Sequence, residues 1–203
     1  MLPVIRQILF GKKHYIPIRH SAGTFDFSIT NGLNVLWVFS DGSVSTAAHP
    51  NVAVSAGTTK LYADNLNAAN IQLNDNASNA MVLLDLVDLQ GKLIYLLDLA
   101  GCTNVTGSLA DLQGNLTNTL SLYNCPNITG VYTPVDTGTP TTTVLTGTGL
   151  SNADMDNTLI AYAAGSKNNG SFTATNKNRT AASDAAVTTL AGRGWTISGL
   201  IKV

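Results

Sequence analysis

Residues 97–107 read Leu-Asp-Leu-Ala-Gly-Cys-Thr-Asn-Val-Thr-Gly, and residues 120–130 read Leu-Ser-Leu-Tyr-Asn-Cys-Pro-Asn-Ile-Thr-Gly. The two stretches are one pattern, Leu-x-Leu-x-x-Cys-x-Asn-(Val/Ile)-Thr-Gly, repeated at an offset of 120 − 97 = 23 residues. The same offset relates Asp88-Leu89-Gln90-Gly91 to Asp111-Leu112-Gln113-Gly114. Such a repeat predicts units that stack on one another, because one unit cannot bury its apolar face alone.

Each unit carries its apolar residues at positions that predict how it folds. The two leucines alternate and therefore point inward from a short strand, after which the chain turns. The cysteine then points into the coil, and the valine or isoleucine closes the far side of the core. The predicted repeat core comprises Leu97, Leu99, Cys102, Val105, Leu120, Leu122, Cys125 and Ile128. We expect the strands of the two units to pair in parallel in adjacent coils.

This pattern resembles the leucine-rich-repeat family, whose units of roughly 20–29 residues contain L-x-L-x-x-(N/C). The Thr-Gly ending is most similar to the plant-type subclass. Degraded copies flank the two clear ones: residues 71–76, with Asn76 at the cysteine position, and residues 144–150, which fit loosely. The resemblance implies a β-rich α/β fold built around a short leucine-rich-repeat solenoid over residues 63–150, with about four coils.

The two cysteines, Cys102 and Cys125, occupy equivalent positions in the two units. We expect them to stack about one strand spacing, roughly 5 Å, apart. They could form a disulfide or metal clip, or a buried ladder of small polarizable side chains. We favour the ladder, which predicts reduced and buried thiols. Two cysteines do not make a disulfide framework, so they leave the redox compartment open.

Residues 23–62 are predicted to form a β cap. Alternating apolar residues occur at Phe25, Phe27 and Ile29 and again from residue 35 to residue 39, and Asp41-Gly42 is a hairpin-turn signal. The stretch 37–43 is similar to the W-x-F-G-D-G-T signature of PKD-type β-sandwich modules, although Ser40 replaces the first glycine. The resemblance implies a truncated PKD-like cap, and an unrelated hairpin is the alternative.

Residues 151–203 are predicted to form a β-α-β-α-β cap. Ser151 is a candidate N-cap, with Asp154 three residues later, and Gly165 ends the first helix. The remaining expected elements are a strand at 171–175, a helix at 183–191 and a strand at 195–197. The expected inward residues of the helices are Met155, Leu159, Ile160, Tyr162, Ala163, Val187 and Leu190. This tail resembles the capping tail of leucine-rich-repeat proteins encoded in bacteriophage and Bacteroidetes genomes.

Residues 1–22 fit neither the repeat nor the caps. Apolar residues precede a basic cluster that runs from Lys12 to His20. We interpret the segment as an arm that anchors the chain to another subunit; a disordered leader is the alternative. The expected anchoring residues are Ile5, Ile8, Leu9 and Phe10.

Composition restricts the possible partners. Charged residues make up 11% of the chain, whereas about 25% is usual. The formal net charge of −1 provides no basic field that would hold nucleic acid or an anionic membrane. The most apolar stretch, 81–99, is interrupted by charged residues, so no membrane span is expected. The N-terminus has no secretory h-region, so export by the usual route is not expected.

No motif indicates catalysis. His14, His20 and His49 have no cysteine or carboxylate at ligand spacing, so neither a metal nor a cofactor is expected. Nucleophile-elbow, dinucleotide-binding and Walker motifs are missing from the sequence. The aspartates at 85 and 88 are expected to cap turns, and those at 154 and 156 to lie in the first turn of a helix. The chain is therefore predicted not to be an enzyme.

The remaining candidates for function are surface aromatics that could contact a host glycan or protein. These are Tyr95, Tyr123 and Tyr132, and Tyr123 is expected to face outward because it follows a strand leucine. The family resemblance and the lack of an export signal favour a virion component: a head fibre, a capsid decoration or a tail-associated protein. This hypothesis implies contact with other virion proteins through the arm and assembly into homo-oligomers, for which a trimer is one option. A bacterial cell-surface adhesin is the alternative.

Overall fold

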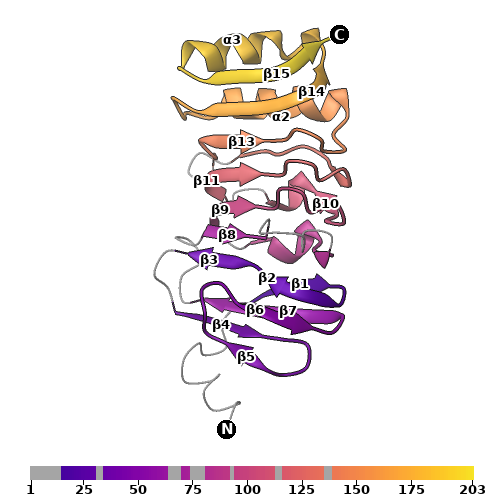
Figure 1. Cartoon of the computed structure of the whole chain (residues 1–203). Coiled ribbons are helices and arrows are strands. Elements are labelled where there is room, and N and C mark those ends of the chain that lie inside the picture. Colours follow the sequence, from indigo (N-terminus) through magenta and orange to yellow (C-terminus); the bar gives the residue numbers. More distant parts are fainter. Residues whose placement is uncertain are drawn as a thin grey trace.

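The computed structural model describes residues 15–30, 34–63, 70–73, 81–91, 94–112, 116–134 and 139–203. Within these residues the chain is mixed α/β, with mostly strands and two α-helices, α2 (Asn152–Ala164) and α3 (Asp184–Gly192). Figure 1 shows an elongated molecule whose strands are stacked along its length, with β-sheets at the N-terminal end and the helices at the C-terminal end.

A seven-stranded sheet extends along most of the molecule, in the order β15-β14-β13-β11-β9-β8-β3 (Figure 1). From β8 to β15 every neighbouring pair is parallel, and only β3 is antiparallel to its neighbour. The strands are β3 (Ser28–Thr30), β8 (Asn70–Gln72), β9 (Ile94–Asp98), β11 (Leu116–Ser121), β13 (Thr142–Val144), β14 (Ser171–Arg179) and β15 (Thr196–Lys202). Parallel neighbours require the chain to return to the same end between strands, as stacked units do.

The predicted pairing of the two repeat strands is confirmed. Leu97 in β9 lies opposite Leu120 in β11, and the strands are parallel. The flanking copies continue the register, because Ile71 pairs with Leu97, and Thr143 pairs with Leu120. One inward row therefore crosses the sheet through its buried members Ile29, Ile71, Leu97, Leu120, Thr143 and Phe172.

Every predicted repeat-core residue is fully buried, and all of them belong to one continuous hydrophobic cluster. On the side opposite the long sheet, β10 (Gly107–Ser108) and β12 (Ile128–Thr129) pair in parallel. Two short 3-10 helices, η3 (Leu86–Leu89) and η4 (Leu109–Leu112), have equivalent positions in the repeat. Asp85 caps η3 as expected, whereas Asp88 forms an ion pair with Arg19 at 2.9 Å.

The N-terminal region contains two small sheets. One has the order β1-β7-β4-β5, from β1 (Tyr15–His20), β7 (Gly57–Ala63), β4 (Val35–Val38) and β5 (Val44–Ser45); the other pairs β2 (Gly23–Asp26) with β6 (Asn51–Val54). The expected Asp41-Gly42 turn connects the antiparallel strands β4 and β5. Phe25 forms the centre of the core, with its ring in edge contact with Phe27, Trp37 and Phe39.

Residues 15–20 differ from the expected domain division. The sequence predicts an arm over residues 1–22. Residues 15–20 instead form β1, which pairs antiparallel with β7 along its whole length. Ile16 and Ile18 alternate inward and are buried in the main core. This part of the proposed arm therefore belongs to the folded β region that begins before residue 23.

Residues 151–203 contain α2, β14, α3 and β15 in alternation, and the first strand of the predicted β-α-β-α-β order corresponds to β13, which lies before residue 151. Ser151 and Asp154 form a capping box at the start of α2, and Gly165 is its C-cap. The prediction that Ile160 faces inward is wrong, since this residue is 43% exposed. The buried face of α2 comprises Met155, Leu159 and Tyr162. These residues are spaced by four and three positions, so they lie on one side of the helix.

Asp154 lies in the first turn of α2 as expected, but the expectation that Asp156 does so is wrong, because Asp156 follows that turn. It is buried and accepts hydrogen bonds from Thr180 N at 3.0 Å, Thr180 Oγ1 at 2.6 Å and Ser183 Oγ at 2.5 Å. These donors lie at the cap and end of η5 (Ala181–Ser183), just before α3. Asp156 therefore ties α2 to the segment that leads into α3.

Candidate functional site

The three candidate tyrosines lie in different surroundings. Tyr95 and Tyr123 are 40% and 47% exposed, so both reach the surface. Tyr132 is fully buried, which makes its assignment to the binding surface wrong. Its ring centroid lies 5.9 Å from that of Tyr162, and burial raises the pKa of its hydroxyl. Tyr132 follows the second repeat and packs beneath α2, where it fills the core.

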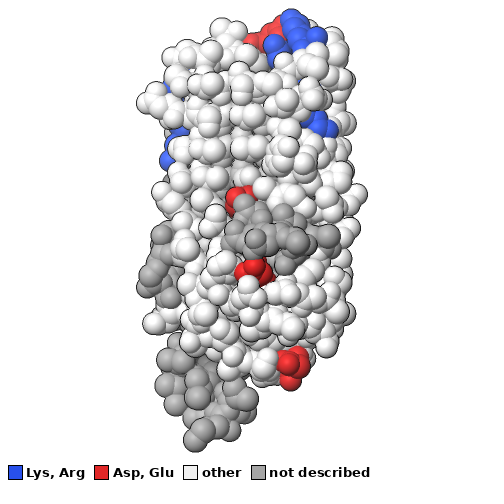
Figure 2. Space-filling model, in the orientation of Figure 1, with Lys and Arg blue, Asp and Glu red and all other residues white. Residues whose placement is uncertain are grey.

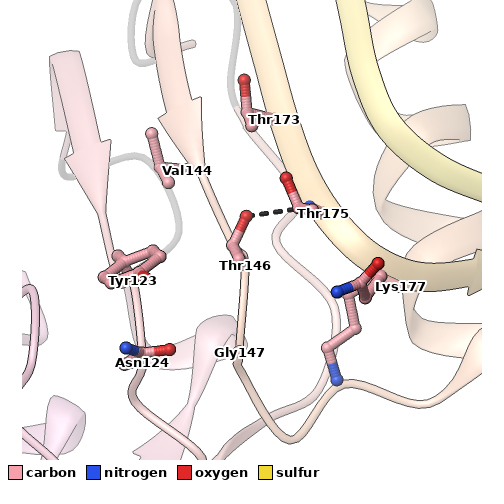
Figure 3. A pocket seen from close by; sticks show the side chains of 9 residues that line it. Tyr123, Asn124, Val144, Thr146, Gly147, Thr173, Thr175 and Lys177 are labelled. Carbon is pink, nitrogen blue, oxygen red and sulfur yellow. Dashed lines mark hydrogen bonds between the residues drawn. The ribbon is translucent and has the colours of Figure 1, made fainter.

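Tyr123 lies at a groove of about 620 Å³ formed by the turns that follow β11 and β13 and by the middle of β14. Figure 3 shows Tyr123 and Asn124 at the end of β11, Thr146 and Gly147 after β13, and Thr173 and Thr175 on β14. Because β11 and β13 are parallel neighbours, their carboxyl ends lie side by side, and β14 continues past them to Arg179. The complete lining is Tyr123, Asn124, Val144, Thr146, Gly147, Thr173, Thr175, Asn176 and Lys177.

Left-handed backbone conformations shape this groove. Asn124, Gly147 and Asn176 have φ angles of 55°, 73° and 61°. Asparagine and glycine are the residues that adopt this region most readily. A Cβ at position 147 would lie 2.5 Å from Oδ1 of Asn124, so only glycine leaves room for the neighbouring side chain. The turn after β11 thus places Asn124 at the groove, and the irregularity within β14 between Thr173 and Lys177 places Asn176 there.

Several polar groups that line the groove keep hydrogen-bond donors and acceptors that the other lining groups do not use. The backbone N–H of Thr175 donates to Oγ1 of Thr146 at 2.8 Å, which joins β14 to the turn after β13 (Figure 3). Within the described residues, the side-chain amides of Asn124 and Asn176 and the hydroxyl of Tyr123 make no hydrogen bond. All three of these side chains belong to exposed residues. They can therefore donate to, and accept from, a bound molecule.

Lys177 places one cation at the groove. Its Nζ donates to the carbonyl of Leu150 at 3.4 Å, and in the described part of the chain it forms no ion pair. Partial burial lowers its pKa. By contrast, Arg179 and Lys202 share Asp184, at 2.6 and 2.5 Å. Figure 2 shows that one face of the molecule carries few charged side chains. On such a surface, a lysine ammonium group is an uncommon feature.

Both cysteines are buried free thiols, as the ladder interpretation predicts. Sγ of Cys102 donates to the carbonyl of Leu73 at 3.2 Å, and Sγ of Cys125 donates to that of Leu99 at 3.1 Å. Burial raises the pKa of Cys125 to about 12 and also raises that of Cys102. Each thiol therefore stays protonated and bonds to the strand of the preceding unit.

The other chemically notable side chains lie away from the groove. Buried His20 is hydrogen-bonded to Oγ1 of Thr59 at 2.9 Å, and His49 pairs with Asp26 at 2.5 Å, both in the N-terminal sheets. Among the described residues, no group of three or more histidine, cysteine or acidic side chains could hold a metal ion. In the same residues, no helix has the length and apolar character needed to cross a membrane. The predicted arm residues Ile5, Ile8, Leu9 and Phe10, and also Asn76, fall outside the described residues.

Of the candidate surface residues predicted from sequence, the groove contains only Tyr123. Its other residues are contributed by separate strands and carry no motif of their own. Asn124 and Asn176 could have been suspected as surface residues. Asn124 follows the strand pattern of the second repeat, and Asn176 interrupts the pattern of the strand that begins at residue 171. Lys177 could not have been suspected, because the strand was expected to end at residue 175. In the structure β14 extends to Arg179 and includes Lys177. No family model, no curated protein and no solved structure matches this chain.

Proposed function

We propose that this chain is a non-enzymatic binding protein, a short leucine-rich-repeat solenoid with a β cap at one end and an α/β cap at the other. The 23-residue offset, 120 − 97, equals the step between paired leucines in β9 and β11. The second parallel sheet, β10 with β12, and the equivalent helices η3 and η4 support a coil that closes on the far side. Stacked units of this kind offer a broad, regular surface.

The observation that carries the binding proposal is the outward face of the long sheet. Two rows of side chains cross this face between β8 and β15. Their side chains point to the opposite side of the sheet from those of the buried row. The first contains Asn70, Leu96, Thr119, Thr142, Ser171 and Thr196, and the second contains Gln72, Asp98, Ser121, Val144, Thr173 and Ser198. Asp98 is the only charged residue in these rows. Hydroxyl and amide groups dominate, which suits contact with neutral polar partners.

We further propose that the protein is a bacteriophage virion surface component, such as a head fibre, a capsid decoration or a tail-associated protein. The resemblance of its repeat and C-terminal cap to phage-encoded repeat proteins supports this placement, and so does its weakly charged surface. The N-terminal residues would attach it to other virion proteins, and the sheet face would contact the host. A bacterial surface adhesin could use the same face and is distinguished by its location.

Deletion of the N-terminal residues tests the attachment. The deletion should remove residues 1–14 and stop before β1, because Ile16 and Ile18 are part of the core. The shortened protein should remain folded, since all the described elements are retained. It should be missing from purified phage particles that incorporate the full chain. If it is incorporated at normal copy number, these residues are not the anchor and the proposed attachment is wrong.

A further inference from the structure

We propose that the groove between Tyr123 and Lys177 binds a saccharide that carries a carboxylate group. This inference rests on the proposed binding function, and it names the class of ligand that this part of the sheet edge would take. It joins three features found together in Figure 3: an exposed aromatic ring, several uncharged polar groups and a single cation.

Tyr123 provides the apolar contact that a sugar ring needs. Its side chain is 47% exposed at the wall of the groove, although it follows the fully buried Leu122. The C–H groups of a pyranose ring form an apolar face, and a tyrosine can cover that face while its hydroxyl stays in contact with water. The turn at Asn124, which has a φ of 55°, places this residue next to Tyr123 at the same groove.

The polar groups match sugar hydroxyls, which both donate and accept hydrogen bonds. Asn124 and Asn176 each offer an amide that is unused within the described residues. Thr146 accepts from Thr175 N, and its hydroxyl hydrogen can still be donated to a ligand oxygen. A volume of about 620 Å³ is within the range of about 300–1,000 Å³ that ligand sites occupy.

Lys177 indicates an acidic ligand. Its ammonium group is partly removed from water and has only a weak, 3.4 Å contact with a carbonyl oxygen. A carboxylate at this position would form a charge-assisted hydrogen bond and compensate for the lost hydration. One isolated cation in a chain with a net charge of −1 does not suit nucleic acid, which requires several phosphate contacts. The bulky apolar groups of the lining are the Tyr123 ring and Val144, and its other side chains are polar or absent.

The test compares acidic sugars with neutral counterparts. Tri-galacturonate and its full methyl ester form one pair, and sialyllactose and lactose form the other. Binding to the full chain is measured by calorimetry and by saturation-transfer NMR. The acidic member of at least one pair should bind more tightly than its neutral partner, and its affinity should fall as salt screens the Lys177 charge. If neither acidic sugar binds more tightly than its neutral counterpart, the proposal is wrong.

Substitutions then locate the binding. Y123A and K177Q should each weaken binding of the acidic sugar by about tenfold, the loss expected for one good contact, whereas K177R should retain it. Y95A and K60Q are matched controls, because Tyr95 is exposed outside the groove and Lys60 lies over the ring of Tyr15. Thermal unfolding of every variant checks that it is folded. Equal binding by K177Q and the unchanged chain would overturn the groove assignment without affecting the particle-attachment experiment.

Discussion

Leu120 is fully buried in the middle of the sheet, with Leu97 on one side and Thr143 on the other. Its replacement by alanine would leave a cavity, because the neighbours belong to strands that cannot close in independently. We expect Leu120→Ala to lower the free energy of unfolding by roughly 2–5 kcal/mol. Urea denaturation measures this change. Leu83→Ala, at a 42% exposed position, is the control and should change stability by less than about 0.5 kcal/mol.

The two thiols give a second prediction for single residues. Cys102 and Cys125 should react with an alkylating reagent only after the protein unfolds, since both are buried and burial raises the pKa of Cys125 to about 12. Protonated thiols are poor nucleophiles at neutral pH. Mass spectrometry after alkylation under non-reducing, denaturing conditions should find both modified. A covalently linked 102–125 peptide pair from native protein would disprove the ladder.

Between elements, the contact of Asp156 with Thr180 and Ser183 connects α2 to the start of α3. Burial alone raises the pKa of this carboxyl, but the hydrogen bonds from Ser183 and Thr180 outweigh it, so the pKa lies below the ordinary value of 3.8. A carboxyl with a lowered pKa in the folded state stabilises the protein at pH values above its unfolded pKa. That stabilisation is lost as the pH falls below 3.8 and through the folded pKa.

We therefore expect Asp156→Asn to destabilise the protein at pH 7 by about 1–3 kcal/mol, because one or more buried donors lose their acceptor. The variant should also lose less stability than the unchanged chain between about pH 4 and pH 2. Urea midpoints measured over this range test both effects. Asp154→Asn is a comparison in the same helix, because it weakens the capping box with Ser151 and leaves the contacts of Asp156 in place. Parallel pH profiles for Asp156→Asn and the unchanged chain would contradict the assigned role.

Elements with a periodic signal could be predicted from sequence. The leucine spacing indicated β9 and β11, and the cap residues indicated α2 and α3. The strand β1 was missed because Pro17 lacks an N–H donor and weakens a strand pattern. The proline is tolerated because β1 is the edge strand of its sheet. The Tyr132 prediction is wrong because the segment after the repeat has no period that identifies its buried side. Ile160 is adjacent to Leu159 but lies off the face that the spacing of Met155, Leu159 and Tyr162 defines, so helical periodicity would have excluded it.

The groove was only partly predictable for a related reason. Tyr123 could be recognised because it follows a strand leucine within the repeat. Its partners in β14 lie beyond the regular spacing, since Thr143 pairs with Phe172 at an offset of 172 − 143 = 29 residues. The contact of Lys177 with Leu150 depends on this irregular step. A site assembled from three units can be seen only after their registers are known.

At the scale of the whole molecule, the stacked sheet separates the described N-terminal β-sheets from the C-terminal cap. Figure 1 shows the described N-terminal β-sheets at one end and α2, α3 and β15 at the other. A protein attached through its N-terminal residues would therefore project the groove and the C-terminal cap away from its attachment point. This arrangement fits an extended surface component, and it predicts which part of the chain is accessible on an assembled particle.

Immunogold electron microscopy tests this account most directly. Antibodies raised against the folded protein and selected for binding to residues 139–203 should label the surface of intact, purified phage particles. Particles that carry a disrupted copy of the gene should show no label, which controls for cross-reaction. Label on intact bacterial cells, with none on particles, would contradict the virion placement and identify the chain as a cell-surface adhesin.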